Sequence, residues 1–409
     1  MVLWWTALHV RLSVRRTGFA IWAFLALSGL GVGCFTVADN LYFQSRGYST
    51  AVIGGLVAVF NIAVAVAEIP AAIVFDRRSY WLAIQLGNLT RTAALVLFFL
   101  SLGLVADVAA EALAGVGAAA MSGTSYAYVL NRLNGDPAQQ RRALGRIAWL
   151  GAAASLLGGL VGAWSFSVSP RSIWLGGAVC MAVAGAALLL GHRGRGSGSS
   201  FAKGEVEPLR HYLRGLGVLA AHPRAWMSVI ANAALVGPLI LWQLRLGGSV
   251  IATVLLGFAV MKVAGVVGGR LIAGRRIPRG LLPLLIGGNA AAIAVFALAG
   301  NSIIVVASFG AHVVAHVAIS VYCSAQFHEV VPDSRRAGAS SVVSLLGSGL
   351  TALAAIAVGM LAEQSALAAV VPSLLLYGLV LAIAIGSGIR ARRKAGGVRD
   401  TEEPALLLD

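Results

Sequence analysis

Long stretches without charged residues recur along the chain and alternate with short polar segments. A helix needs about 20 apolar residues to cross roughly 30 Å of membrane hydrocarbon. Stretches of this length are Thr17–Ala38, Gly47–Ala67, Ala112–Asn131, Ile147–Pro170, Ser172–Gly191, Ala225–Leu244, Ala337–Ala362 and Ser365–Ile389. The uncharged region 280–328 has room for two more spans, and two further spans each contain one basic residue, Arg91 or Lys262. The pattern therefore predicts an all-α membrane protein with twelve transmembrane helices.

The composition excludes a soluble domain. Of the 409 residues, 59% are hydrophobic and 11% are charged, whereas about 25% of residues are charged in an average soluble domain. The first span is longer than a signal-peptide core and no cleavage site follows it, so we expect it to remain as an anchor. Cys34, Cys180 and Cys323 fall in three different spans, which indicates helix packing and neither a disulfide framework nor a metal cluster.

The basic residues predict how the chain lies in the membrane. Of the 31 lysines and arginines, 26 fall in loops and ends on one predicted side. The other side has Arg46, Arg171 and Arg245, and two basic residues lie inside spans. Positively charged loops stay in the cytoplasm. We therefore expect a protein of the bacterial inner membrane with both termini on the cytoplasmic side. The same bias explains the net charge of +16, so nucleic-acid binding is not needed to account for it. The expected partner of these basic residues is the lipid bilayer.

A long polar stretch divides the spans into two sets of six. We expect an N-terminal half over 1–191, a cytoplasmic linker over 192–223, a C-terminal half over 224–389 and a cytoplasmic tail over 390–409. An Arg-Arg-Ala triplet opens span five and recurs before span eleven. Repeated halves are typical of secondary transporters, whose substrate site lies near the membrane midplane. The alternative explanation is that short basic loops recur in any polytopic protein.

The cytoplasmic end of span two has the sequence Glu-Ile-Pro-Ala-Ala-Ile-Val-Phe-Asp-Arg-Arg over residues 68–78. It resembles the loop signature of the major facilitator superfamily. In that family a small residue four positions before an Asp-Arg pair lets two helices approach, and the charged pair holds the cytoplasmic gate. The resemblance assigns these roles to Ala72, Asp76 and Arg77. Ala72 replaces the usual glycine, and the signature's final glycine and basic residues are absent here.

Two further segments extend the resemblance to the same superfamily. The glycine-rich residues 115–124 look like its fourth helix, but Glu111 stands where proton-coupled drug exporters carry an arginine. Gly151, Gly158 and Gly162 fit the first three glycines of its exporter signature, in which Ala163 replaces the following proline. The resemblance implies a twelve-helix transporter that works by alternating access, and it favours export.

Charged side chains inside the predicted spans are candidate functional residues. A charge in hydrocarbon costs at least about 2.5 kcal/mol, so it needs a partner or a water-filled cavity. We predict that Glu68 and Arg91 form an ion pair that couples transport to protons, with a static structural pair as the alternative. Glu111 is a further proton-coupling candidate, although it lies near the outer face and also fits a surface role.

Four residues are candidates for the substrate pathway: Asp39, Lys262, His312 and His316. Asp39 lies near the outer face, where a role at the protein surface is an alternative to a role in transport. Lys262 is too far from Arg270 to reach the membrane surface easily, so we expect it to face the central cavity. His312 and His316 lie on one helical face, where they can bind metal, shuttle protons, contact substrate or form a hydrogen-bonded packing pair.

These observations predict a secondary active transporter that exports a small organic or drug-like molecule in exchange for protons. No phosphate-binding loop of an ATP-driven motor is present. We expect no enzymatic activity, no catalytic residues, no cofactor and no bound metal, and we expect a monomer. Two alternatives remain at this stage. One is an importer of a sugar, acid or other nutrient, working as a symporter or facilitator, and the other is a membrane-embedded enzyme or lipid-handling protein.

Overall fold

The computed structural model describes residues 2–75, 79–122, 124–130, 137–192, 217, 220–247, 250–272, 280–331 and 336–399. These residues form helices joined by short connections, and the described part of the chain contains no strand. Its helices are α1 (Val2–Thr36), α2 (Asp39–Ser45), α3 (Thr50–Phe75), α4 (Tyr80–Leu100), α5 (Leu104–Met121), α6 (Thr124–Leu130), α7 (Pro137–Val168), α8 (Ser172–His192), α10 (Pro223–Ala233), α11 (Val236–Leu246), α12 (Ile251–Ile272), α13 (Leu281–Leu298), α14 (Ser302–His328), α15 (Arg336–Ala362) and α16 (Ala366–Arg399).

Twelve helical segments within the described residues are long and apolar enough to cross a membrane. This number confirms the predicted all-α membrane fold. Most spans are single helices, but span one consists of α1 and α2, and span seven consists of α10 and α11. The break in span seven is explained by Pro238, because proline has no N–H for the carbonyl four residues earlier and its ring clashes with that carbonyl.

The fourth span differs from the prediction, which placed it at Ala112–Asn131. It begins at Leu104, ends at Met121 and is followed by the short helix α6. The prediction located spans as stretches without charged residues. It misplaced this span because the span contains Asp107 and Glu111. Asp107 is fully buried, and it is accommodated because it pairs with an arginine from another element.

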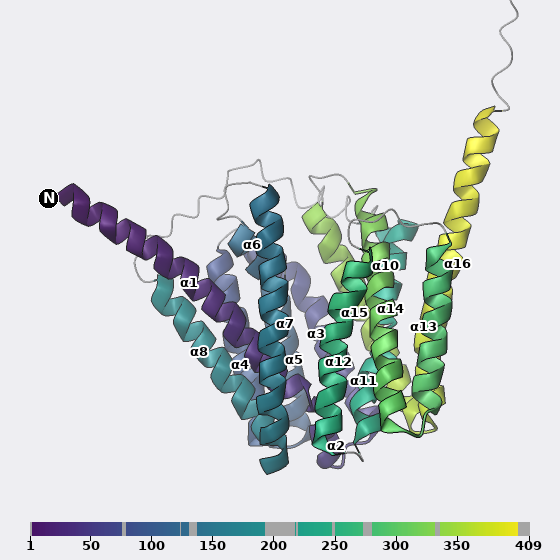
Figure 1. Ribbon diagram of the computed structural model, residues 1–409, viewed down its shortest axis with the longest axis horizontal. Helices are drawn as coiled ribbons and strands as arrows, with labels where there is room; N and C mark the ends of the chain where they lie inside the picture. The colour runs from purple at the N-terminus through teal and green to yellow at the C-terminus, as the bar shows by residue number, and fades with distance from the viewer. Residues whose placement is uncertain are drawn as a thin grey trace, which may run out of the picture.

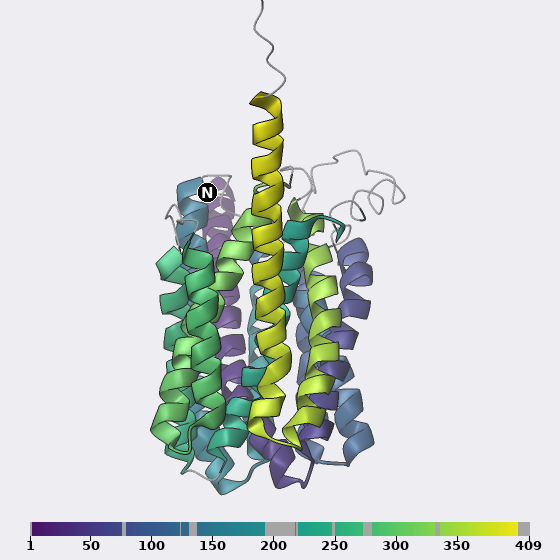
Figure 2. The same ribbon diagram turned by 90° about the vertical axis from the view of Figure 1, so that its right-hand side faces the viewer.

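The helices form one bundle in which α1, α4 and α8 lie on one side and α13 and α16 on the other (Figure 1). The N-terminus and the end of α16 lie at the same end of this bundle, as an even number of spans requires. Figure 2 shows α16 extending well beyond the neighbouring helices at that end. That this end is cytoplasmic remains a prediction, and most of the predicted linker 192–223 lies outside the described residues.

The first six spans meet the last six through α3 with α15, α7 with α12, and α2 with α11. Two of these contacts depend on glycine. A Cβ atom at Gly54 would lie 2.9 Å from the Cα atom of Gly359, and one at Gly159 would lie 2.5 Å from the ring of Phe258. The two sets of helices therefore approach each other more closely than larger residues would permit.

Candidate functional site

A cavity of about 550 Å³ is lined mainly by helices of the first half of the chain. Phe60 and Asn61 of α3, Arg91 of α4 and Ser122 beyond α5 belong to its wall, and Ser348 of α15 closes one side. This volume lies in the range of sites that hold small molecules. The wall combines an apolar surface with hydroxyl and amide groups, and Arg91 is its charged member. Such a cavity suits a small organic molecule with at least one polar group.

The glycine-rich part of α5 makes room for the Arg91 side chain. A Cβ atom at Gly117 would lie 2.6 Å from Cγ of Arg91 and 2.6 Å from the carbonyl oxygen of Gly87. Gly115 has the corresponding role against α3, because its Cβ would meet Ala63 at 2.8 Å. The resemblance of this segment to a glycine-rich fourth helix thus corresponds to close packing among α3, α4 and α5, which places Arg91 at the cavity.

Glu68 lies at the border between the two halves and does not pair with Arg91. Its carboxylate interacts with the hydroxyl groups of Ser122 and of Ser344 on α15. The side chain is buried, and its Oε2 atom has no hydrogen-bond partner among the described residues. The ion pairs among the described residues are Arg46–Asp107 and Arg224–Glu329, so the predicted Glu68–Arg91 pair is wrong for this conformation. The need of each buried charge for a partner does not fix the direction in which its side chain points.

The end of the bundle away from the termini is closed by hydrogen bonds between the halves. Gln243 of α11 donates from Nε2 to Oδ1 of Asp39 at 2.6 Å and to the carbonyl oxygen of Thr36 at 3.0 Å. Its Oε1 accepts from the backbone N–H of Asn40 at 2.8 Å, and Nδ2 of Asn40 donates to the carbonyl oxygen of Ile240 at 3.0 Å. These bonds join α2 to α11, and we call them the outer contact.

Two more predicted candidates, Lys262 and Glu111, lie near the outer contact. Nζ of Lys262 is 4.8 Å from the centre of the Phe258 ring, and its charge attracts that of Asp39. Glu111 lies within electrostatic range of the carboxylates of Asp39 and Asp107. The structure therefore brings Asp39, Glu111 and Lys262 into one region, although they come from α2, α5 and α12. Neither Lys262 nor Glu111 belongs to the wall of the 550 Å³ cavity.

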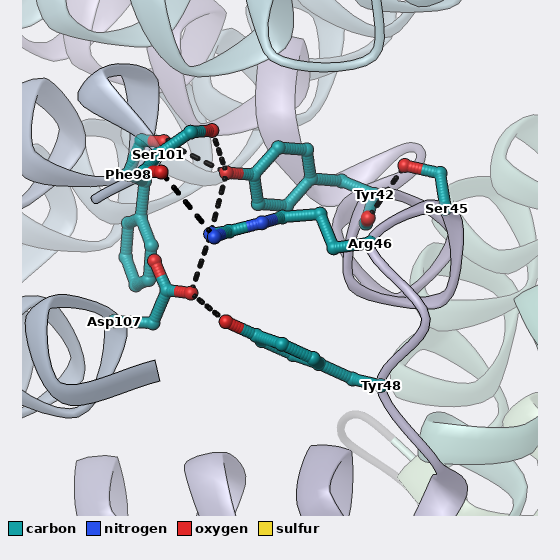
Figure 3. Close-up of polar contacts among 7 residues, drawn as sticks. All are labelled: Tyr42, Ser45, Arg46, Tyr48, Phe98, Ser101 and Asp107. Atoms are coloured by element: carbon teal, nitrogen blue, oxygen red, sulfur yellow. Dashed lines mark hydrogen bonds and ion pairs between the residues drawn. The ribbon is translucent and has the colours of Figure 1, made fainter. Parts of the chain in front are cut away.

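A second polar cluster lies beside the outer contact and includes a residue that the sequence analysis did not propose, Asp107 (Figure 3). Nη1 of Arg46 lies 2.6 Å from Oδ2 of Asp107, and the Tyr48 hydroxyl donates to the same oxygen at 2.6 Å. Burial and the neighbouring Asp107 carboxylate raise the pKa of Tyr48 to about 12, so its phenol stays protonated at neutral pH. Oδ1 of Asp107 is buried without a hydrogen-bond partner.

Aromatic and backbone groups hold Arg46 in place. Its guanidinium lies 5.7 Å from the centre of the Tyr42 ring and 5.2 Å from that of Tyr48. The Tyr42 hydroxyl donates to the carbonyl oxygen of Phe98 at 2.8 Å and lies 2.6 Å from the Ser101 hydroxyl. The cluster thus joins α2, the end of α4 and the start of α5. A usable signal was present in the sequence, because Arg46 is one of few arginines on the predicted outer side and Asp107 is an isolated acid on the same predicted side.

The two histidines form hydrogen bonds within the second half. Nδ1 of His312 lies 2.7 Å from Oδ1 of Asn289, and Nδ1 of His316 lies 2.8 Å from the Tyr377 hydroxyl. Both histidines are buried, and neither belongs to the cavity wall. No group of three or more potential metal ligands occurs among the residues that the structure describes.

The predicted cytoplasmic gate cannot be compared with the structure. Asp76 and Arg77 lie outside the described residues, as does the side chain of Ala72.

Twelve candidate membrane spans, with a cavity lined mainly by helices of the first half and by Ser348 of α15, are typical of a membrane transporter. The family model of the Major Facilitator Superfamily matches residues 21–355. The chain therefore belongs to the major facilitator superfamily. No curated protein sequence matches this chain.

Solved structures of transporters have the same fold. The nucleoside transporter NupG aligns with a TM-score of 0.68 at 14% identity over 90% of this chain and 98% of its own. A bacterial homolog of the human lysosomal transporter Spinster, in an inward-facing and unoccupied conformation, aligns with a TM-score of 0.66 at 15% identity over 96% and 99% of the two chains. For a D-xylose-proton symporter the TM-score is 0.66, at 15% identity over 89% and 96%.

Proposed function

We propose that this protein is a proton-coupled secondary transporter that exports a small organic molecule from a bacterial cytoplasm. The observation that carries the proposal is the cavity beside Arg91 together with the closed outer contact at the opposite end from the termini. With the termini inside, this arrangement is an inward-facing state that can receive cargo from the cytoplasm. Rocking of the two halves would break the outer contact and form the cytoplasmic gate at Ala72, Asp76 and Arg77.

Glu68 is the residue that we propose to exchange protons with the cytoplasm and the outer side. Its carboxylate lies between Ser122 of the first half and Ser344 of the second half. When the halves rock, this carboxylate must lose one of these neighbours and change its exposure to water, which changes its affinity for a proton. Proton binding is thereby linked to the orientation of the cavity. Glu111 and Asp39 are further proton-coupling and pathway candidates beside the outer contact.

The direction of transport is proposed from the resemblance of the α7 glycines to the exporter signature. Gly158 and Gly162, which match the exporter signature, allow α7 to approach the backbone of α1 at Leu30 and Cys34. Flux measurements in right-side-out and inverted vesicles test this direction. Accumulation in inverted vesicles with an acidic interior supports export, and accumulation in right-side-out vesicles with an acidic exterior indicates import.

We predict that Glu68→Gln abolishes transport driven by a pH gradient but retains exchange of substrate across the membrane. The amide keeps the size and hydrogen bonding of the side chain and cannot bind a proton. The measurement compares gradient-driven flux with counterflow in proteoliposomes. Glu363→Gln is the matched control, because Glu363 accepts a hydrogen bond from the Ala51 backbone at an exposed position. Full gradient-driven flux in Glu68→Gln would remove Glu68 from the coupling mechanism.

We predict that Gln243→Leu shifts the protein toward the state in which the outer contact is open. Leucine has a similar size but removes the hydrogen bonds to Asp39, Asn40 and Thr36. At about 0.5–1.5 kcal/mol per bond, the equilibrium should change by about 2 kcal/mol. Spin labels at Ser45 and Val250 should report a longer distance by electron paramagnetic resonance.

The matched control for this experiment is Gln326→Leu, because the side chain of Gln326 bonds to Glu329 within the second half. Its distance distribution should equal that of the wild type. An unchanged distribution in Gln243→Leu would show that other contacts determine closure.

A further inference from the structure

Arg91 is a cation without a partner among the residues that the structure describes. It forms no ion pair or hydrogen bond with any residue that the structure describes. Glu68, the carboxylate expected to neutralise it, interacts instead with Ser122 and Ser344. Arg91 lies within a transmembrane helix, where an uncompensated charge costs several kcal/mol. A charged side chain at this depth requires a partner, and the described residues supply none.

The position of Arg91 indicates where that partner binds. Its side chain passes Gly117, whose missing Cβ leaves the space it needs, and belongs to the wall of the 550 Å³ cavity. A lipid-facing arginine would extend toward the membrane surface, whereas this one belongs to the wall of a cavity. Water can hydrate the guanidinium when the cavity is empty, and a ligand that enters must replace this hydration with an equally strong interaction.

The other residues of the cavity wall indicate the chemistry of the rest of the ligand. Phe60, Leu25 and Ile147 provide an apolar surface, and hydroxyl groups come from Ser122, Ser125 and Ser348. Nδ2 of Asn61 donates to the carbonyl oxygen of Val57 at 2.8 Å, so Oδ1 of Asn61 is the atom that can accept from a ligand. No carboxylate belongs to this wall, as far as the described residues define it. The cavity therefore offers one cation, several neutral polar groups and an apolar surface.

We propose that Arg91 binds the anionic group of the transported molecule, so that the substrate class is small organic anions with an apolar body. The planar guanidinium can donate two parallel hydrogen bonds to a carboxylate, sulfonate or phosphate, which gives both affinity and orientation. This inference rests on the transport function proposed above and specifies its substrate class.

Binding to the purified full-length protein tests the proposal without any gradient. The probes are three carboxylates, benzoate, cinnamate and nicotinate, and their neutral amides, benzamide, cinnamamide and nicotinamide. Ligand binding raises the midpoint of thermal unfolding by mass action. We expect at least one carboxylate to raise the midpoint in the wild type and its amide to have a much smaller effect. Failure of all three carboxylates, or an equal effect of the amides, would overturn the proposal.

Variants then connect the anion preference to Arg91. Arg91→Gln should weaken binding of the active carboxylate about 10- to 100-fold, because hydrogen bonds to a charged group contribute about 1.5–3 kcal/mol. Arg91→Lys keeps the charge but loses the planar guanidinium, so it should have an intermediate affinity. This variant provides the test if Arg91→Gln does not fold. Arg171→Gln removes the same charge at an exposed position and should bind as the wild type does. Wild-type affinity in both Arg91 variants would overturn the assignment.

Transport and anion binding can fail separately. If the wild type binds carboxylates through Arg91 but moves none of them in proteoliposomes, the transport proposal fails and the binding assignment stands. If it transports only the neutral amides, the anion class is wrong and the transport proposal stands.

Discussion

Asp107→Ala should destabilise the protein by about 3–5 kcal/mol, because it leaves the Arg46 guanidinium without its anionic partner. The Asp107 side chain is fully buried and that of Arg46 is 19% exposed, so solvent can compensate little of the loss. The Tyr48 hydroxyl loses its acceptor in the same variant. We expect a large decrease in the midpoint of thermal unfolding of the purified protein.

The second ion pair provides a control for this experiment. Arg224 and Glu329 lie 3.4 Å apart with side chains 34% and 60% exposed. Exposed pairs contribute about 0–1 kcal/mol, so Glu329→Ala should change the midpoint little. The double variant Arg46→Ala with Asp107→Ala should be less destabilised than the sum of the two single variants, because the charges are removed together. Equal effects of Asp107→Ala and Glu329→Ala would contradict a structural role for the buried pair.

The Arg46–Asp107 pair also affects the proposed transport cycle through its position. Arg46 directly follows α2, and α2 carries Asp39 and Asn40 of the outer contact. By holding the end of α2 against α4 and α5, the cluster places the residues that meet Gln243. A less stable cluster should therefore weaken the outer contact as well as the fold.

The number of spans was predictable because a bilayer imposes one simple requirement on every span. Each must present enough consecutive apolar residues to cross the hydrocarbon, and this property depends on local sequence. The error in the fourth span has the same origin. Asp107 and Glu111 interrupt the apolar run, and the compensation of Asp107 by Arg46 is a contact between residues 61 positions apart, which a local criterion cannot detect.

The candidate site was predicted only in part, because side-chain direction depends on packing. The Glu68–Arg91 pair is predicted because each charge inside the membrane needs a partner. Gly117, on a third helix, instead leaves the space through which Arg91 reaches the cavity. Conversely, Asp39 and Lys262 were selected separately as charges inside or near spans. The structure places them within electrostatic reach of each other, which depends on how the halves meet.

Gly158→Ala should destabilise the protein by about 1–3 kcal/mol, the range for overpacking a tightly packed core. A Cβ atom at Gly158 would overlap the carbonyl oxygen of Leu30 and lie 3.0 Å from the backbone nitrogen of Cys34. The obstacle is the backbone of α1, which cannot rotate away as a side chain can, so the two helices must separate. Small residues in membrane helices permit this close approach, and without it the packing between α1 and α7 is lost.

The matched control for Gly158→Ala lies two helical turns earlier on α7. A Cβ atom at Gly151 would meet nothing within 4 Å, although this glycine belongs to the same exporter signature. Because alanine also favours the helix by about 1 kcal/mol over glycine, Gly151→Ala should be neutral or slightly stabilising. Thermal unfolding of the two variants separates packing from any general intolerance of α7 to substitution. Equal destabilisation by both changes would contradict the packing explanation, and a neutral Gly158→Ala would show that α1 and α7 are free to separate.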